Sequence, residues 1–245
     1  DSVISIENRA FEDCIGLASV MIPDSVTSIG YLAFADCERL TALTIPNSVT
    51  SIKHSTFDNC ISLVAFDVDM NNNTYSSIQG ILFSHDEKTL YCFPVGKTVG
   101  HYAIPDSVTS IGDRAFRSCG FLTSISIPDS VTTIGDSAFC LCEGLTSITI
   151  PDSVTSIEGR AFRDCDGLTS VTIPDSVTSI GEWAFADCKG LTSVTIPDSV
   201  TAIEYYAFEG CESLTSVTIP GLVTKIGPST FADCKGLMSV TIPDS

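Results

Sequence analysis

Basic side chains are scarce in this sequence, because 12 Lys and Arg face 30 Asp and Glu and give a formal net charge of −18. An acidic surface of this kind repels phosphate groups, so nucleic acid and anionic membranes are poor partners. No run of about eighteen apolar residues is present, so this segment holds no membrane span. The first 25 residues also lack the basic-then-apolar layout of a signal peptide.

Motifs for catalysis are also missing. Gly96-Lys97-Thr98 imitates the end of a phosphate-binding loop, but Tyr91 stands where that motif requires a glycine. The three His residues are isolated, and Cys140-Leu141-Cys142 lacks the spacing of a zinc finger. We therefore expect a protein that is not an enzyme and that has no cofactor and no dedicated metal site.

One short unit is copied along the whole chain. Its most regular marker is an Ile-Pro pair that recurs every 23 residues, with a single interval of 59 residues, which is one step of 23 plus one of 36. A period of this length is typical of solenoid proteins. The pair stands at Ile22-Pro23, Ile45-Pro46, Ile104-Pro105, Ile127-Pro128, Ile150-Pro151, Ile173-Pro174, Ile196-Pro197, Ile219-Pro220 and Ile242-Pro243.

Within one unit, Leu191–Ile196 alternates apolar and polar residues and predicts a short strand that Pro197 ends. Val200–Ile203 predicts a second extended piece, and Ala207–Cys211 suits one helical or 3-10 turn. A lone coil buries too few apolar side chains to offset its ordering entropy, so coils must stack. We predict a right-handed β-solenoid of about ten coils with short parallel strands, forming one domain over residues 1–245.

The repeated blocks resemble a known family. Leu168–Pro174, Ser176–Ile180 and Ala184–Cys188 are similar to the BspA-like leucine-rich repeats. The long coil, residues 65–103, is similar to the hairpin-bearing variant of that family, with Tyr75–Phe83 as the hairpin followed by Lys88–Leu90. The resemblance implies an extracellular or cell-surface protein of a microbe or protist, and adhesion to matrix or cells as in some members.

Both ends of the sequence match the repeat and carry no polar cap. Asp1–Val3 and Pro243–Ser245 fall at corresponding points of the unit. Bare solenoid ends expose apolar layers and strand edges. We therefore expect a fragment of a longer array, or a segment that docks end to end on its own copies.

Nine of the eleven cysteines form a ladder, three residues after the repeat Phe. Their Cβ atoms would stand about 4.8 Å apart, beyond the distance of about 3.5–4.5 Å that a disulfide needs, so we expect buried free thiols. Bridges or metal binding along the ladder remain the alternative. Cys92 and Cys140 lie outside it, and Cys140 occupies a position held elsewhere by charged residues. We expect Cys140 to face water and to be the reactive thiol, with Cys92 as a second candidate.

Two polar columns allow more than one interpretation. An Asp column follows the Ile-Pro pairs, and we expect each carboxylate to accept backbone N–H groups of its own Pro-Asp-Ser turn, with Ca²⁺ binding as the alternative. Ser and Thr rows on the strands suit ordinary solvated strands, with ice binding as the alternative. The Asp column contains Asp24, Asp106, Asp129, Asp152, Asp175, Asp198 and Asp244.

Variation between the copied coils marks two surface features. Asn72-Asn73-Thr74 in the long coil is a sequon, which makes Asn72 a candidate glycosylation site. Two residues before the repeat Phe, three successive coils carry Arg160, Trp183 and Tyr206, and Tyr205 lies beside them. Trp, Tyr and Arg dominate interaction hot spots, so these four residues are the candidate partner-binding site. The alternative is that the rings only cover an edge of the solenoid.

These features together predict a non-enzymatic, secreted or cell-surface repeat protein. Its expected role is adhesion, protein–protein interaction or assembly of an extracellular structure, with a protein or matrix ligand or its own copies as partner. A calcium-binding or ice-binding solenoid is the alternative, and an enzyme is the least favoured class.

Overall fold

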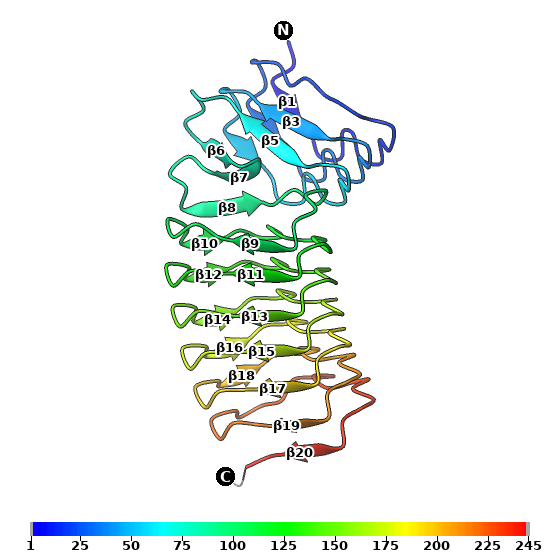
Figure 1. The fold of residues 1–245 in the computed structure, drawn as a ribbon, viewed down its shortest axis with the longest axis vertical. Coiled ribbons are helices and arrows are strands. Elements are labelled where there is room, and N and C mark those ends of the chain that lie inside the picture. The colour runs from blue at the N-terminus through cyan, green and yellow to red at the C-terminus, as the bar shows by residue number, and fades with distance from the viewer. Residues whose placement is uncertain (1, 244–245) are drawn as a thin grey trace. The chain divides into compact units, whose positions relative to one another are not determined.

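The computed structural model describes residues 2–243, and the terminal residues Asp1, Asp244 and Ser245 lie outside that range. The chain falls into two compact units that divide between Thr98 and Val99. Both are built as a β-solenoid, with about ten turns in total, repeats of about 23 residues and parallel strands (Figure 1). The predicted solenoid is confirmed, whereas its description as a single domain stays a prediction.

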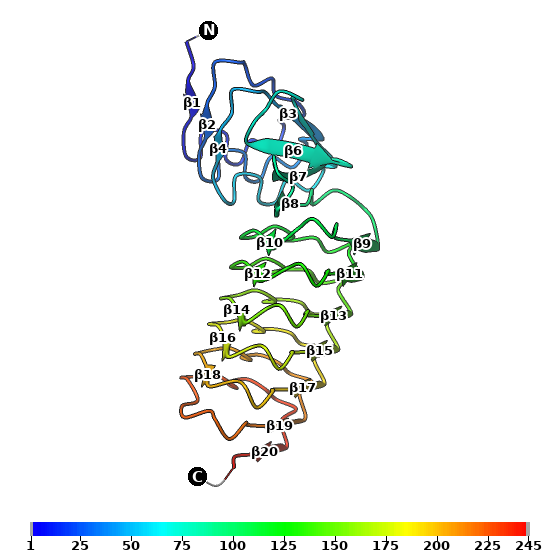
Figure 2. The same ribbon diagram turned by 90° about the vertical axis from the view of Figure 1, so that its left-hand side faces the viewer.

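The first unit begins with parallel strands from successive coils. β1 (Ser5–Ile6), β2 (Ser28–Ile29) and β4 (Ser51–Ile52) form one sheet, and β3 (Ala42–Ile45) pairs with β5 (Ala65–Val68). Ser5 faces Ser28 and Ser28 faces Ser51, so the register advances by one repeat per strand. Figure 2 shows β1, β2 and β4 side by side.

The long coil adds antiparallel strands to this unit. β6 (Tyr75–Ile78), β7 (Ile81–Ser84) and β8 (Thr89–Cys92) form a meander. Gln79 and Gly80 connect β6 to β7 with φ values of 53° and 81°, which is the left-handed pair that a two-residue type I′ hairpin turn requires. The predicted hairpin is confirmed, and β8 extends it by one strand.

The second unit repeats two columns of parallel strands (Figure 1). The register is again one repeat, as in Ser147, Ser170 and Ser193, which face one another in turn. The first column contains β9 (His101–Ala103), β11 (Ser124–Ser126), β13 (Ser147–Thr149), β15 (Ser170–Thr172), β17 (Ser193–Thr195), β19 (Ser216–Thr218) and β20 (Ser239–Thr241). The second column contains β10 (Ser110–Ile111), β12 (Thr133–Ile134), β14 (Ser156–Ile157), β16 (Ser179–Ile180) and β18 (Ala202–Ile203).

Stacked Phe rings and buried thiols run through the core of the second unit. Rings of successive repeats lie 5.0–5.4 Å apart between centroids and within 11° of parallel. Each ladder thiol from Cys142 to Cys234 donates a hydrogen bond of 3.1–3.2 Å to the carbonyl of the repeat Phe in the preceding coil. All eleven cysteines are free, as predicted for the ladder. The stacked Phe residues are Phe116, Phe139, Phe162, Phe185 and Phe208.

The predicted helical or 3-10 turn around the repeat Phe is wrong. Trp183, Phe185 and Asp187 donate their backbone N–H groups to carbonyls of the next coil at 2.7–3.2 Å, whereas Ala184 and Ala186 close four-residue turns within their own coil. Trp183 and Asp187 have φ values of 60° and 57°, the left-handed conformation found at the third position of a type II turn. The segment is therefore a chain of β-turns, because alternate N–H groups are used between coils.

Replacing one ring of the Phe stack should destabilise the second unit strongly. Phe162 is fully buried between two stacked rings. Phe162→Ala leaves a cavity and should lower the free energy of unfolding by about 3–5 kcal/mol. Urea denaturation followed by circular dichroism measures the change, with the exposed Thr172→Ala as control, expected within about 0.5 kcal/mol. Equal midpoints for the two variants would contradict the stacked core.

Stability should also fall in alkaline solution. Burial, and then the neighbouring Cys14 thiol, raises the pKa of Cys37 to about 11, and burial raises the pKa of Cys60 to about 12. An unfolded thiol ionises near pH 8.5, so the stabilisation is complete below about pH 8.5 and is lost as the pH rises towards the folded pKa values. Each thiol contributes a slope of up to about 1.4 kcal/mol per pH unit.

Urea titrations at a series of pH values test this dependence. Cys60→Ala should reduce the slope above about pH 8.5, because it removes one thiol that ionises only in the unfolded chain. An unchanged slope would show that other groups control the alkaline transition.

Candidate functional site

The structure brings the four predicted partner-binding residues together on one edge of the second unit. Arg160 lies in the turn segment after β14, Trp183 in the segment after β16, and Tyr205 and Tyr206 in the segment after β18. Because the register is one repeat per coil, equivalent positions of successive coils become neighbours in space. Figure 1 shows β14, β16 and β18 as successive levels of this unit.

A stack of planar groups forms the centre of this edge. The rings of Trp183 and Tyr206 lie 4.2 Å apart between centroids, with 17° between their planes. Arg163 places its Cζ atom 5.0 Å from the Trp183 ring centroid, a cation–π contact. Arg163 comes from the preceding coil and Tyr206 from the following one, so Trp183 is held between them. Tyr205 meets Tyr206 edge-on at 5.8 Å and is 38 % exposed.

Glu182 fixes the polar atoms of the stack. Trp183 donates its Nε1–H to Glu182 Oε1 at 2.9 Å, and Arg160 Nη2 lies 3.7 Å from the same oxygen. The Tyr205 hydroxyl also donates to Glu182, and this hydrogen bond raises the pKa of Tyr205 above its usual value. Arg160 also faces Asp136, at 3.7 Å. One carboxylate thus orients two aromatic side chains of the edge.

Sequence reasoning missed Arg163 and Glu182 as members of this site. Glu182 occupies the position of Tyr205 one coil earlier, and Arg163 follows the repeat Phe162 directly. Both columns vary between coils, which is the same signal that singled out Trp183. Charged residues are frequent in those columns, so the variation alone did not distinguish them.

The column of Trp183 has a strained backbone in every coil that carries it. Trp183 and Tyr206 both have φ values of 60°, and Ser137 and Ser229 at equivalent positions have 56° and 54°. The left-handed conformation costs about 1–2 kcal/mol for a residue with a Cβ. The same backbone therefore accepts serine or a large aromatic residue, so the choice of side chain here is not set by coil geometry.

A smaller cluster lies at the equivalent repeat positions of the first unit. Arg9 Cζ lies 5.9 Å from the Tyr31 ring centroid, and Tyr31 meets His54 at 5.0 Å with 61° between the rings. Arg9 also pairs with Glu12 at 3.0 Å. Arg9 and Tyr31 occupy different columns of the repeat, so their contact is not visible in the sequence.

The family of the chain follows from its repeats. A profile described as BspA type leucine rich repeat region, in six copies, matches residues 1–99, 86–172 and 155–245. The chain belongs to the BspA-type leucine-rich repeat family. The resemblance found in the sequence is thus confirmed, and the family suggests protein–protein interaction or adhesion. Comparison with curated proteins gives no match.

Solved structures of leucine-rich repeat proteins share the fold. A leucine rich cell surface protein from Faecalibacterium prausnitzii matches with a TM-score of 0.71 and 31 % identity, over 100 % of this chain and 59 % of that one. The pneumococcal vaccine antigen PcpA matches with a TM-score of 0.81 and 23 % identity, over 98 % of this chain and 66 % of that one. A leucine-rich repeat protein from Bacteroides ovatus is 30 % identical, with a TM-score of 0.56, over 98 % and 64 % of the two chains. This BspA-type chain thus spans about three fifths to two thirds of the length of these relatives.

Membrane insertion through a helix has no support in the described part of this BspA-type chain. Within residues 2–243, no helix has the length and hydrophobicity that would carry it across a bilayer.

The expectation that Cys140 faces water is wrong. Cys140 is 3 % exposed, and its Sγ accepts a hydrogen bond from Arg117 Nη1 at 3.0 Å. Its column holds long charged side chains in neighbouring coils, and these cover the short thiol instead of leaving it in solvent. Burial raises the pKa of Cys140, although Arg117 acts in the opposite direction. Cys92 is partly buried, and burial raises its pKa as well.

The expectation of a glycan on Asn72 is also contradicted. Asn72 is 1 % exposed, and its Nδ2 donates to the carbonyls of Pro46 and Val49 at 2.8 and 3.0 Å. Its Oδ1 accepts the N–H groups of Thr74 and Tyr75, both at 2.8 Å. The amide therefore closes the long coil onto the preceding one, which leaves its nitrogen no room for a sugar.

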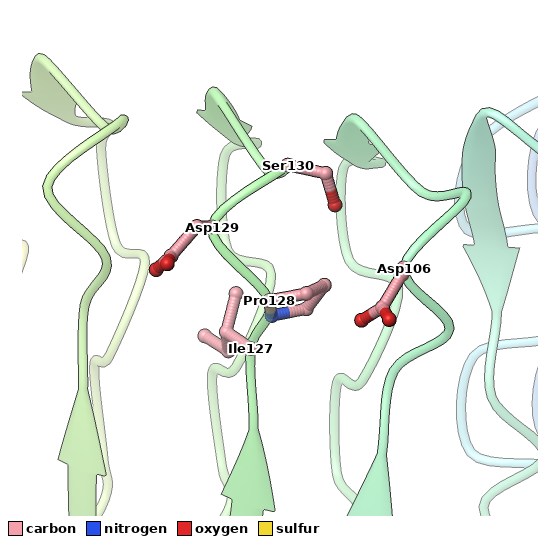
Figure 3. Close-up of a pocket in the computed structure, with 5 residues that line it drawn as sticks. All are labelled: Asp106, Ile127, Pro128, Asp129 and Ser130. Atoms are coloured by element: carbon pink, nitrogen blue, oxygen red, sulfur yellow. The ribbon is translucent and has the colours of Figure 1, made fainter.

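Contrary to the expectation, the described Asp carboxylates of the acidic column do not accept the backbone N–H groups of their own turns. Among the described residues, its Asp carboxylates make no hydrogen bond. From Asp129 to Asp198 the Ser that follows each Asp donates to the preceding coil instead, as when Ser130 Oγ donates to Val108 O at 2.7 Å. Asp106 and Asp129 line an open pocket of about 430 Å³ together with Ile127, Pro128 and Ser130. Figure 3 shows Pro128 between the two carboxylates.

The calcium and ice alternatives gain no support from these surfaces. No group of three or more His, Cys, Asp or Glu within residues 2–243 is arranged to hold a metal ion. Asp244, the last member of the acidic column, lies outside the described residues. The Ser and Thr rows are exposed on the strands, for example at Ser170 and Thr172, and ice binding by them stays a prediction.

The native protein should protect Cys140 from thiol reagents. Iodoacetamide pulses at neutral pH, followed by mass spectrometry, should label Cys140 as slowly as the buried ladder residue Cys142, because both thiols are inaccessible and their pKa values are raised. Labelling of both should become fast in urea. Rapid labelling of Cys140 in the folded protein would contradict its burial.

Proposed function

We propose that this chain is a non-enzymatic binding protein, secreted or on the cell surface, that attaches to a protein or matrix partner through the edge of Arg160, Trp183, Tyr205 and Tyr206. The observation that carries the proposal is the Trp183–Tyr206 stack. The membership in the BspA-type family supports protein binding or adhesion. Assembly with other copies of the chain, end to end, stays a prediction.

The composition of the edge suits a contact surface. Trp, Tyr and Arg supply large contact areas with few rotatable bonds, and they carry most of the energy in many interfaces. Charged residues border the aromatic centre, since Arg163 lies over the Trp183 ring and Arg160 faces Glu182 beside it. An aromatic centre with a charged rim is the usual anatomy of a protein interface.

The burial of the core beneath the edge also favours binding over mere coverage of the solenoid. The core beneath this edge is already closed, because Ala184, Phe185, Ala207 and Phe208 are 0 % exposed. Coils with Ser137 at the same position close their core equally well, since Ala138 is 0 % and Phe139 is 1 % exposed. Large aromatic residues are therefore not needed at this edge for folding.

Replacing both stacked rings by serine tests the proposal. The double variant Trp183→Ser/Tyr206→Ser places at these positions the residue that Ser137 and Ser229 show to be compatible with the backbone. Loss of an interaction hot spot should weaken partner binding by at least about 2 kcal/mol, roughly thirtyfold in Kd. Surface changes of this kind usually alter stability far less.

Binding is measured on surfaces coated with collagen, fibronectin or laminin, and self-association by sedimentation. Tyr31→Ser in the first unit is the matched control for loss of one partly exposed ring. The proposal fails if the double variant binds as tightly as the parent, or if the parent neither binds a coated protein nor self-associates.

A further inference from the structure

One face of the aromatic stack has no planar neighbour. Trp183 is covered on one side by Arg163 and on the other by Tyr206. The coil after Tyr206 carries the short Ser229 at the equivalent position, and within the described residues no ring or cation lies over that second face of Tyr206. The stack of planar groups therefore ends at Tyr206, which is partly exposed.

Two carboxylates without an ion pair follow Tyr206 and the equivalent Ser229 in their turn segments. Glu209 lies three residues after Tyr206, and Asp233 lies at the equivalent of Asp187 two coils further on. In the part of the chain that the structure describes, neither Glu209 nor Asp233 forms an ion pair within 4.0 Å. Burial, and then Asp187 and Asp233, raises the pKa of Glu209, whereas Arg163 acts in the opposite direction.

At the other end of the same stack, an arginine of the chain lies between an aromatic ring and carboxylates. There Arg163 lies over the Trp183 ring and contacts two carboxylates, with Nε 3.2 Å from Asp164 Oδ2 and Nη2 3.7 Å from Asp187 Oδ2. A planar cation thus stacks on the aromatic face while its N–H groups meet acidic residues. At the Tyr206 end, within residues 2–243, no cation–π contact covers the ring, and neither Glu209 nor Asp233 has an ion pair within 4.0 Å.

We infer that the edge binds an arginine side chain of a partner protein, with its guanidinium on the outer face of Tyr206 and its N–H groups directed at Glu209 and Asp233. The inference rests on the proposed function and names the chemistry of its partner. Arginine fits better than lysine, because the guanidinium is planar, stacks on rings and forms forked hydrogen bonds to carboxylates. The net charge of −18 also favours a basic partner surface.

Titration with hexa-arginine and hexa-lysine peptides tests the inference on the full chain. Both peptides carry the same charge, so their affinity ratio separates guanidinium stacking from general attraction to an acidic protein. Trp183 is the only Trp, so its fluorescence reports directly on the stack, and calorimetry gives an independent Kd. At physiological salt, hexa-arginine should bind about tenfold more tightly than hexa-lysine and change the Trp183 emission.

Single substitutions test whether the preference for arginine over lysine depends on Tyr206 and Glu209. Tyr206→Ser should reduce the arginine to lysine ratio to about one, whereas Tyr206→Phe keeps the ring face and should retain the ratio. Glu209→Gln should weaken hexa-arginine binding several-fold. Asp129→Asn removes the same charge on the distant turn edge of the coils and should leave the ratio unchanged. Circular dichroism and urea midpoints confirm that each variant is folded.

Equal affinity for the two peptides, or a ratio that survives Tyr206→Ser, overturns the guanidinium site. If the ratio is one but the Trp183→Ser/Tyr206→Ser variant still loses binding to coated proteins, the proposed contact edge stands and only its ligand chemistry fails. If the ratio is tenfold but the double variant binds coated proteins normally, the proposed function fails instead.

Discussion

Hydrogen bonds between neighbouring coils are the interaction on which the rest of this structure depends. Backbone N–H groups at alternate positions, such as Phe162 and Asp164, reach carbonyls of the next coil at 2.8 and 2.9 Å. Side chains repeat the pattern, since Thr169 Oγ1 and Ser176 Oγ donate to carbonyls of the preceding coil. Each coil thus supplies hydrogen-bond partners to its neighbour, so an inserted residue would break this pattern. An insertion is accommodated only where the extra residues form hydrogen bonds among themselves. The meander of β6, β7 and β8 does this for the long coil.

The fixed register explains why a recognition edge arises without any change of fold. Residues 23 apart become spatial neighbours, so three substitutions in successive copies place Arg160, Trp183 and Tyr206 in one row. The same register puts Arg163 over Trp183 and lets Glu182 bond to both Trp183 and Tyr205. Cooperation among these side chains is therefore a consequence of periodicity, and local sequence context contributes little to it.

Sequence periodicity predicted the solenoid, the Phe and Cys ladders and the hairpin of the long coil, because each depends on a repeat that is visible in the sequence. It also brought the four residues of the edge together. It failed for the turn around the repeat Phe, because helical propensity does not reveal that alternate N–H groups are used between coils. Cys140 and Asn72 were misjudged for a related reason. Their burial depends on Arg117 and on carbonyls of another coil, and no column of the repeat shows such contacts.

The left-handed residues at the start of each Phe turn have a consequence for how such arrays evolve. Glycine would suit φ values near 60° best, yet the column that holds Ser137, Trp183 and Tyr206 contains none. A residue with a side chain is thus retained at a conformational cost in every coil. The identity of this residue is free to change, because the same turn holds serine, arginine, leucine, tryptophan or tyrosine. Duplication of a coil then supplies a further position of this column, where mutation can sample recognition chemistry while the turn and the Phe core keep their geometry.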